Sequence, residues 1–104
     1  NKNGIIMFYA PWCSQSKSLI RVWTYLAQAG GQQFVIMAVN CEQQLGIASA
    51  LQIRGYPTFK IVKKDGSLEQ YNGNRSLEGF SKLLYLLVKT AEQEIEFEMS
   101  HKGR

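Results

Sequence analysis

The residue of this sequence best suited to do chemistry is Cys13, which follows an apolar run and precedes a helical pattern. Residues 4–10 (GIIMFYA) are typical of a strand buried on both faces. A cysteine at the start of a helix meets free backbone N–H groups and the positive end of the helix dipole, which lower its pKa from about 8.5 to between about 3.5 and 7.5. Because the thiolate is the form that attacks disulfides, Cys13 is predicted to be a nucleophile. The alternative is an inert buried cysteine.

Alternating strand and helix patterns predict the frame that must position this cysteine. The expected order is strand, helix, strand, helix and then a two-stranded hairpin and a closing helix, which is an α/β arrangement. The first two strands should be parallel, because a helix connects them as in a right-handed crossover. The hairpin strands should be antiparallel, with a turn at Asp65-Gly66. Ser76 is a candidate cap for the last helix. The ranges are 4–10, 17–29, 34–39, 43–51, 58–62, 68–71 and a helix that starts near residue 77.

Composition limits the class of protein. A chain of 104 residues, 45% of them hydrophobic, is enough for one packed domain. The net charge of +4 comes from dispersed Lys and Arg residues, which does not favour a nucleic-acid partner. No apolar stretch approaches the roughly 18 residues of a membrane span. Two cysteines far apart in the sequence indicate neither a disulfide scaffold nor a zinc site, and no metal is expected.

Three segments resemble landmarks of the protein disulfide isomerase family. Residues 8–17 (FYAPWCSQSK) are similar to the active-site segment of that family, residues 54–58 (RGYPT) to its cis-proline loop, and residues 73–75 (GNR) to its glycine-arginine segment. The matches span essentially the whole chain. The resemblance implies a thioredoxin-like fold, here the minimal βαβ-α-ββα core.

The resemblance also implies roles for individual residues. Cys13 would be the attacking cysteine, and Trp12 would flank its thiol. Pro57 would lie beside it with a cis bond to Tyr56, so that an extended client segment can pair with the backbone there. Thr58 completes this loop, and these four neighbours of the thiol are the expected client-binding residues. An ordinary trans turn at Pro57 is the alternative.

Two positions depart from the family pattern. Ser16 stands where the family has its resolving cysteine; a serine can hydrogen-bond a thiolate but cannot form a disulfide with it. Release of a client then needs an outside thiol, with glutathione as a candidate co-substrate, and no bound cofactor is expected. Met7 stands where the family carries a buried acid, which would be costly without a resolving thiol to deprotonate. The neutral Ser14-Gln15 pair replaces the family histidine, so Cys13 should be less acidic than in strongly oxidising relatives.

Two further residues are candidate modulators. Arg75 resembles a family arginine that acts on the resolving cysteine, although a solvated loop residue is an equal alternative. Cys41 ends the second predicted strand on the same side of the sheet as Cys13, so it is a candidate resolving thiol; a small buried filler is the usual role of such a cysteine. His101 lies alone in the polar tail and is not expected to be a ligand.

The start of the chain has a consequence for the sheet. Full thioredoxin domains begin with a further strand and helix, and the resemblance implies that this unit is lacking. Residues 34–39 would then form an apolar edge strand, to be covered by the tail or paired in a dimer. We expect a domain over residues 1–91 and a tail or linker over 92–104, which could form a strand, a helix extension or a linker.

These patterns lead to two competing functions. The first is monothiol thiol–disulfide exchange with unfolded or cysteine-containing clients through Cys13, as isomerisation or covalent retention. The second is a non-catalytic module that binds clients or a partner chain. A monothiol glutaredoxin-like protein that binds glutathione or an iron–sulfur cluster ranks last, because such proteins usually lack the tryptophan before the cysteine. The family resemblance implies the endoplasmic reticulum lumen or the secretory pathway.

Overall fold

A four-stranded mixed sheet forms the centre of the molecule, in the order β2-β1-β3-β4. The structure, a computed structural model, describes residues 2–101. Strands β1 (Gly4–Tyr9) and β2 (Val35–Asn40) are parallel, whereas β3 (Thr58–Val62) runs antiparallel to β1 and to β4 (Leu68–Gln70). The predicted α/β thioredoxin-like fold is therefore confirmed, with strands within two residues of their expected ranges.

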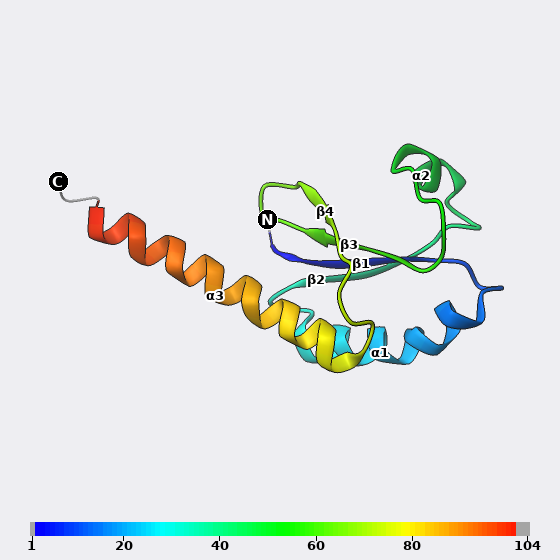
Figure 1. Ribbon diagram of the computed structural model, residues 1–104, viewed down its shortest axis with the longest axis horizontal. Coiled ribbons are helices and arrows are strands. Elements are labelled where there is room, and N and C mark those ends of the chain that lie inside the picture. Colours follow the sequence, from blue (N-terminus) through cyan, green and yellow to red (C-terminus); the bar gives the residue numbers. More distant parts are fainter. Residues whose placement is uncertain (1, 102–104) are drawn as a thin grey trace.

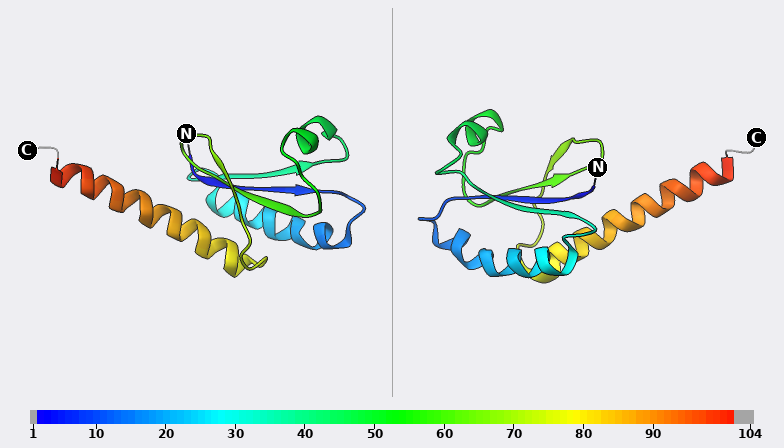
Figure 2. Two further views of the ribbon diagram at one scale, coloured as in Figure 1. Left: turned by 45° about the horizontal axis from the view of Figure 1, so that its top comes forward. Right: turned by 180° about the vertical axis from the view of Figure 1, so that it is seen from behind.

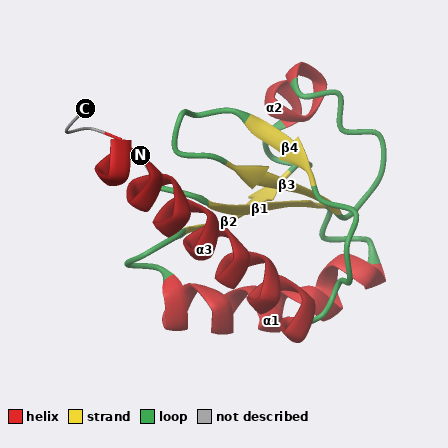
Figure 3. Ribbon diagram, turned by 60° about the vertical axis from the view of Figure 1, so that its left-hand side comes forward, coloured by secondary structure: helices red, strands yellow, loops and turns green. Residues whose placement is uncertain are grey.

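Helices cover both faces of this sheet. Helix α2 (Leu45–Ala50) lies on one face, and α1 (Ser14–Gly30) and the first half of α3 (Leu77–His101) lie on the other (Figures 1 and 3). Helix α2 is shorter than predicted. Helix α1 begins three residues before the predicted start, because its first turn is polar and the apolar periodicity starts only after it. No described helix is both long and apolar enough to cross a membrane.

Two apolar clusters fill the space between the layers. The larger cluster lies between the sheet and helices α1 and α3 and holds a group of aromatic rings. The ring centroid of Trp23 lies 4.8 Å from that of Phe80 and 5.3 Å from that of Phe59. The smaller one lies on the α2 side and contains Phe8 and Cys41. Alternate residues of the buried strand β1 point into the two clusters, as expected for a strand covered on both faces.

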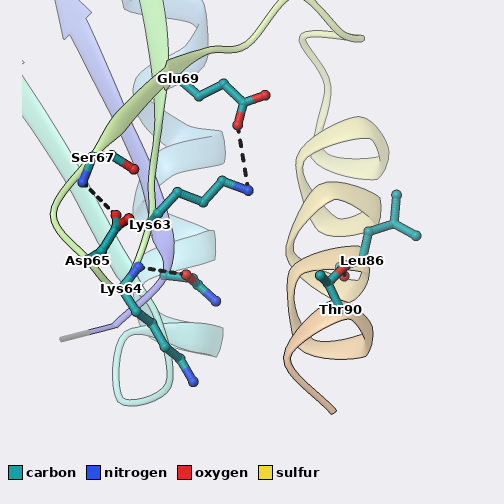
Figure 4. Close-up of polar contacts among 8 residues, drawn as sticks. Lys63, Lys64, Asp65, Ser67, Glu69, Leu86 and Thr90 are labelled. Carbon is teal, nitrogen blue, oxygen red and sulfur yellow. Dashed lines mark hydrogen bonds and ion pairs between the residues drawn. The ribbon is translucent and has the colours of Figure 1, made fainter. Parts of the chain in front are cut away.

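Strand β1 also explains one glycine. A Cβ atom at Gly4 would overlap the carbonyl oxygen of Val35, so the close approach of β1 and β2 requires a residue without a side chain there. The predicted hairpin turn is confirmed. Gly66 has a φ of +88°, and the backbone N–H of Ser67 donates to Asp65 Oδ1 at 2.9 Å (Figure 4).

The predicted tail is helical. Helix α3 continues without interruption past position 91 to His101. Of the three alternatives for the tail, a strand, a helix extension or a linker, the structure has the helix extension. Its second half projects beyond the sheet and does not lie along β2 (Figures 1 and 2). The tail therefore does not cover the edge strand in this structure, and the domain boundary stays a prediction. The side-chain position of His101 lies outside the described residues.

Candidate redox site

A tight turn places Cys13 at the end of the sheet where β1 stops. The backbone N–H of Cys13 donates to the carbonyl of Ala10 at 3.0 Å, and Pro11 occupies the second position of this turn, which suits its fixed φ. Cys13 is the N-cap of α1, with an extended backbone at φ −88° and ψ 118°. Its side chain is half-buried. The thiol therefore lies at the positive end of a 17-residue helix and within reach of solvent.

The start of α1 lowers the pKa of Cys13. The largest cause is the hydrogen bond that the backbone N–H of Ser16 gives to the ionised sulfur. The Ser16 hydroxyl and the backbone N–H of Gln15 act in the same direction, and partial desolvation opposes them. No acidic residue lies in the first turn of the helix to counteract this effect. A thiolate at Cys13 is thus stabilised by local donors, as the position of the cysteine in the sequence predicts.

Ser16 is fully buried, with 0% of its surface exposed. Its Oγ atom has no hydrogen-bond partner among the described residues, although a buried hydroxyl is normally paired. In the neutral state the Cys13 thiol donates to the carbonyl oxygen of Tyr56, with Sγ and O 3.6 Å apart. Ionisation turns the sulfur into an acceptor, and the Ser16 hydroxyl can then donate to it, which accounts for its share in lowering the pKa of Cys13.

The loop at Tyr56 and Pro57 lies opposite the Cys13 thiol and contacts Trp12, as the family resemblance implied. The Tyr56–Pro57 peptide bond is cis, and Pro57 is buried. Trp12 is 69% exposed and meets the Tyr56 ring edge to face, with centroids 5.9 Å apart and an interplanar angle of 87°. Thr58 differs from this group, because its hydroxyl donates to the carbonyl of Gly55 at 2.7 Å and so holds the loop itself.

Cys41 lies in the smaller core cluster and is 1% exposed. Its backbone N–H donates to the carbonyl of Tyr9 at 2.9 Å, and its Sγ lies 3.8 Å from the carbonyl oxygen of Val39. Burial raises the pKa of this thiol, and a hydrogen bond from the Tyr56 side chain offsets this only in part. A buried, protonated thiol is a poor nucleophile, so its surroundings favour the role of a core filler over that of a resolving thiol.

Arg75 and Met7 both contact the larger core cluster. The guanidinium carbon of Arg75 lies 5.3 Å from the centre of the Phe59 ring, a cation–π contact that anchors the loop before α3. Met7 is fully buried in this cluster, surroundings in which an apolar side chain is less costly than a carboxylate. A modulating role of Arg75 stays a prediction.

Two participants were not identified from the sequence. The carbonyl of Tyr56 accepts the thiol proton of Cys13, and the backbone N–H of Gln15 is a second donor to the thiolate. The signal for the carbonyl was the expected proximity of the cis-proline loop to the thiol, and the signal for the N–H was the position of Cys13 at the start of a helix, where backbone N–H groups are free. Main-chain groups are present at every position, so their involvement follows from backbone geometry and not from residue type.

Comparison with known protein families gives one match over most of the chain. The family model described as Thioredoxin matches residues 1–85. Among curated proteins, a protein disulfide-isomerase of Gallus gallus is 34% identical over 86 residues, which cover 81% of this chain and 17% of that protein. A thioredoxin domain-containing protein of Theileria parva is 38% identical over 77 residues, covering 73% of this chain and 34% of that protein. The chain thus spans less than two thirds of the length of these relatives.

Solved structures agree with the fold. The zinc-bound form of human ERp44 superimposes with a TM-score of 0.74 and 26% identity, over 82% of this chain and 27% of that chain. The first thioredoxin domain of mouse protein disulfide-isomerase A4 gives a TM-score of 0.65 and 27% identity, over 75% of this chain and 57% of that chain. The four-stranded sheet and its helices are therefore shared with domains of disulfide isomerase relatives.

Proposed function

Because this chain belongs to the thioredoxin family, we propose that it exchanges disulfides with client proteins through Cys13 by a mechanism that uses a single thiol. The observation that carries this proposal is the half-buried Cys13 at the N-cap of α1, whose pKa is lowered by the backbone N–H of Ser16. The other cysteine, Cys41, is buried and its pKa is raised. Only one of the two thiols is thus suited to attack.

The reaction proceeds in two exchanges. The Cys13 thiolate attacks one sulfur of a client disulfide, forms a mixed disulfide and releases the second client sulfur as a thiolate. A thiolate of the client or of glutathione then attacks the client sulfur of the mixed disulfide, and Cys13 leaves as a thiolate. When the attacking thiol belongs to the client, disulfides are rearranged without net oxidation. Ser16 cannot perform this second step, so the mixed disulfide lasts until another thiol arrives.

The loop at Tyr56 supports a site for an extended client segment. In the neutral protein the Tyr56 carbonyl accepts the Cys13 thiol. Ionisation of Cys13 removes that donor, and the carbonyl becomes free to accept an N–H from the client backbone next to the attacked disulfide. Trp12 and the Tyr56 ring offer an apolar wall beside the sulfur. Thiolate formation and client binding are coupled in this proposal.

Trapping with a disulfide-containing peptide tests the proposal. The wild-type protein should form a covalent adduct that is seen by mass spectrometry and removed by glutathione. Cys13→Ala should form none, and Cys41→Ala should react like wild type. A wild-type protein that forms no adduct at neutral pH, or an adduct that maps to Cys41, would overturn the monothiol mechanism.

The second candidate function is a binding module that does not use its thiol. The exposed Trp12, stacked edge to face on Tyr56, favours this reading, because exposed aromatic side chains are frequent in binding surfaces. Here Cys13→Ala should bind a cysteine-free peptide as tightly as wild type, whereas Trp12→Ala should bind more weakly. For either function we propose clients of the endoplasmic reticulum lumen, where client disulfides persist.

A further inference from the structure

A groove of about 230 Å³ lies beside the loop that faces Cys13. Gly55 and Thr58, which flank the Tyr56–Pro57 peptide bond, are among the residues that line it. The groove therefore begins next to the Tyr56 carbonyl, the group that accepts the Cys13 thiol. We call it the basic groove and define it by Gln52, Arg54, Gly55, Thr58, Lys60 and Gln70.

Strand pairing gathers the polar side chains of the basic groove on one face of the sheet. Lys60 lies opposite Ile6, and Thr58 lies opposite Phe8, across the β1–β3 pair. Because Ile6 and Phe8 belong to the smaller core cluster, these side chains are on the α2 side. Gln70 is the partner of Lys60 on β4 and shares this face. The loop over residues 52–55, which leaves α2, forms the rest of the groove.

The two cations of the basic groove lack an anionic partner within residues 2–101. No hydrogen bond or ion pair is found there for the Arg54 side chain, and Lys60 Nζ donates to the neutral Gln70 Oε1 at 3.3 Å. No acidic residue is among the described residues that line the groove. Glu69, next to Gln70 on β4, faces the other side of the sheet and pairs with Lys63 at 3.5 Å (Figure 4). The groove thus carries positive charge that no described residue neutralises.

One residue of the basic groove has a strained backbone. Gln52 follows the C-cap of α2 with a φ of +57°, in the left-handed region that residues other than glycine and asparagine rarely adopt. A glycine would adopt this conformation at lower cost. The glutamine instead sets a side-chain amide at the groove, where its NH₂ group can donate to a bound acceptor. Strained residues of this kind are frequent at binding sites.

We propose that the basic groove binds a carboxylate side chain of the client, so that Cys13 prefers disulfides with acidic residues nearby. The inference rests on the proposed function and names its class of client. The Arg54 guanidinium can hold a carboxylate through two parallel hydrogen bonds, and Lys60 adds a second positive charge. An extended client that pairs with the Tyr56 backbone advances about 3.3 Å per residue. Lys60 is two residues along β3 from Thr58, so the acidic residue should lie two or three positions from the client cysteine.

Rates of adduct formation with matched peptides test the groove. Each peptide has a single cysteine joined to a small leaving thiol, and carries Glu, Gln or Lys at the second and third positions on both sides of it. The measured quantity is the ratio of the rate constants for the Glu and Gln peptides, which cancels any change in the thiol itself. Arg54→Gln/Lys60→Gln should lower this ratio about fivefold at low salt, and the difference from wild type should disappear at high salt. An unchanged ratio would overturn the proposal.

Charge removal elsewhere is the matched control. Lys64→Gln/Lys82→Gln removes the same charge at exposed positions outside the groove and should keep the wild-type ratio. An equal fall in both double variants would assign the effect to net charge and overturn the proposal. Arg54→Glu/Lys60→Glu should reverse the preference and favour the Lys peptide, which a merely structural role of these residues would not produce.

Two further measurements separate this proposal from its neighbours. Glutathione also carries carboxylates, but its release of the peptide adduct should proceed at the same rate in wild type and Arg54→Gln/Lys60→Gln. Slower release with an unchanged peptide ratio would assign the groove to glutathione and overturn the proposal. Binding of labelled peptides with serine in place of cysteine, followed by fluorescence anisotropy, should also favour the Glu peptide. Failure of every cysteine peptide to form an adduct would contradict the chemistry of Cys13, whereas equal binding of the Glu and Gln peptides would contradict the groove.

Discussion

The Cys13 thiol donates to the carbonyl oxygen of Tyr56, 43 residues away in sequence, with the sulfur and oxygen atoms 3.6 Å apart. One residue thereby faces both cysteines of the chain, because the Tyr56 side chain also packs against the core cluster that contains Cys41 and lowers the pKa of that thiol. The two thiols nevertheless differ in every property that governs attack. Cys13 is half-buried with a lowered pKa, and Cys41 is buried with a raised pKa.

Ser16→Ala should raise the pKa of Cys13. The substitution removes the hydroxyl that donates to the thiolate and leaves the larger contribution, the backbone N–H of the same residue, in place. The pH dependence of Cys13 alkylation, measured in a Cys41→Ala background, reports this change. Ser14→Ala is the matched control, because Ser14 is exposed in the same helical turn and is not among the groups that lower the pKa of Cys13. An unchanged titration in Ser16→Ala would remove the hydroxyl from the mechanism.

Native alkylation at neutral pH should label Cys13 and spare Cys41. Burial keeps the thiol of Cys41 protonated and out of contact with the reagent. Unfolding in guanidinium chloride should expose it, so that two labels are found per chain by mass spectrometry. Labelling of Cys41 at the same rate as Cys13 in the native state would show that the small core cluster opens readily.

The stability of the fold should depend on pH with opposite signs for the two cysteines. Because the pKa of Cys13 is lower in the folded state, ionised Cys13 stabilises the fold. This contribution to the free energy of unfolding is fully present above about pH 8.5 and is lost as pH falls through the folded-state pKa. The raised pKa of Cys41 makes folding less favourable as pH rises from about 8.5 through the folded-state pKa. Denaturant midpoints of Cys13→Ala and Cys41→Ala between pH 6 and 10 should diverge from wild type in these opposite directions, and parallel curves would contradict the assignment.

Sequence patterns predicted the order and type of the strands and helices, but they predicted the ends of the helices less well. The alternating hairpin and the buried strand β1 were placed closely because burial sets their periodicity. The first turn of α1 is polar and its role is to present backbone donors to Cys13, so no apolar signal could mark it. Beyond position 91 the acid–apolar alternation fitted a strand, a helix or a linker, and only the continuation of α3 decided between them.

The candidate site, too, could be predicted from the sequence only in part. Cys13 and the loop at Pro57 could be paired from the sequence by resemblance, and the structure brings them together. The structure adds that the Thr58 hydroxyl donates to the Gly55 carbonyl and that Arg75 contacts the Phe59 ring, while contact of Thr58 with clients stays a prediction. Such local hydrogen bonds and ring contacts depend on rotamers and loop geometry, which residue type does not determine.

Ser16→Cys should shorten the life of the mixed disulfide. A cysteine three residues after the helix cap can attack the sulfur of Cys13 and release the client, and it converts the site into a dithiol. With a peptide whose single cysteine is joined to a small leaving thiol, the wild-type adduct should therefore persist once the small thiol is removed, while the variant should discharge the peptide and form an internal disulfide. Ser18→Cys is the control for an added thiol, since Ser18 is exposed further along α1. Adducts of equal lifetime in wild type and Ser16→Cys would argue against the resolving position.

Trp23→Phe should destabilise the fold without altering Cys13. The indole N–H donates to the carbonyl oxygen of Met37 at 2.6 Å and so joins α1 to the edge strand β2, while the ring packs on Phe80 and Phe59. Phenylalanine keeps an aromatic ring but removes the hydrogen bond and part of the volume, at a cost of about 1–3 kcal/mol in the free energy of unfolding. Denaturant unfolding measures this cost, and Tyr25→Phe, an exposed position on α1, should stay within about 0.5 kcal/mol of wild type. Because the redox site depends on the first turn of α1, Cys13 alkylation should keep its pH dependence in folded Trp23→Phe; a shifted titration would mean that the core contact also sets the position of the helix start.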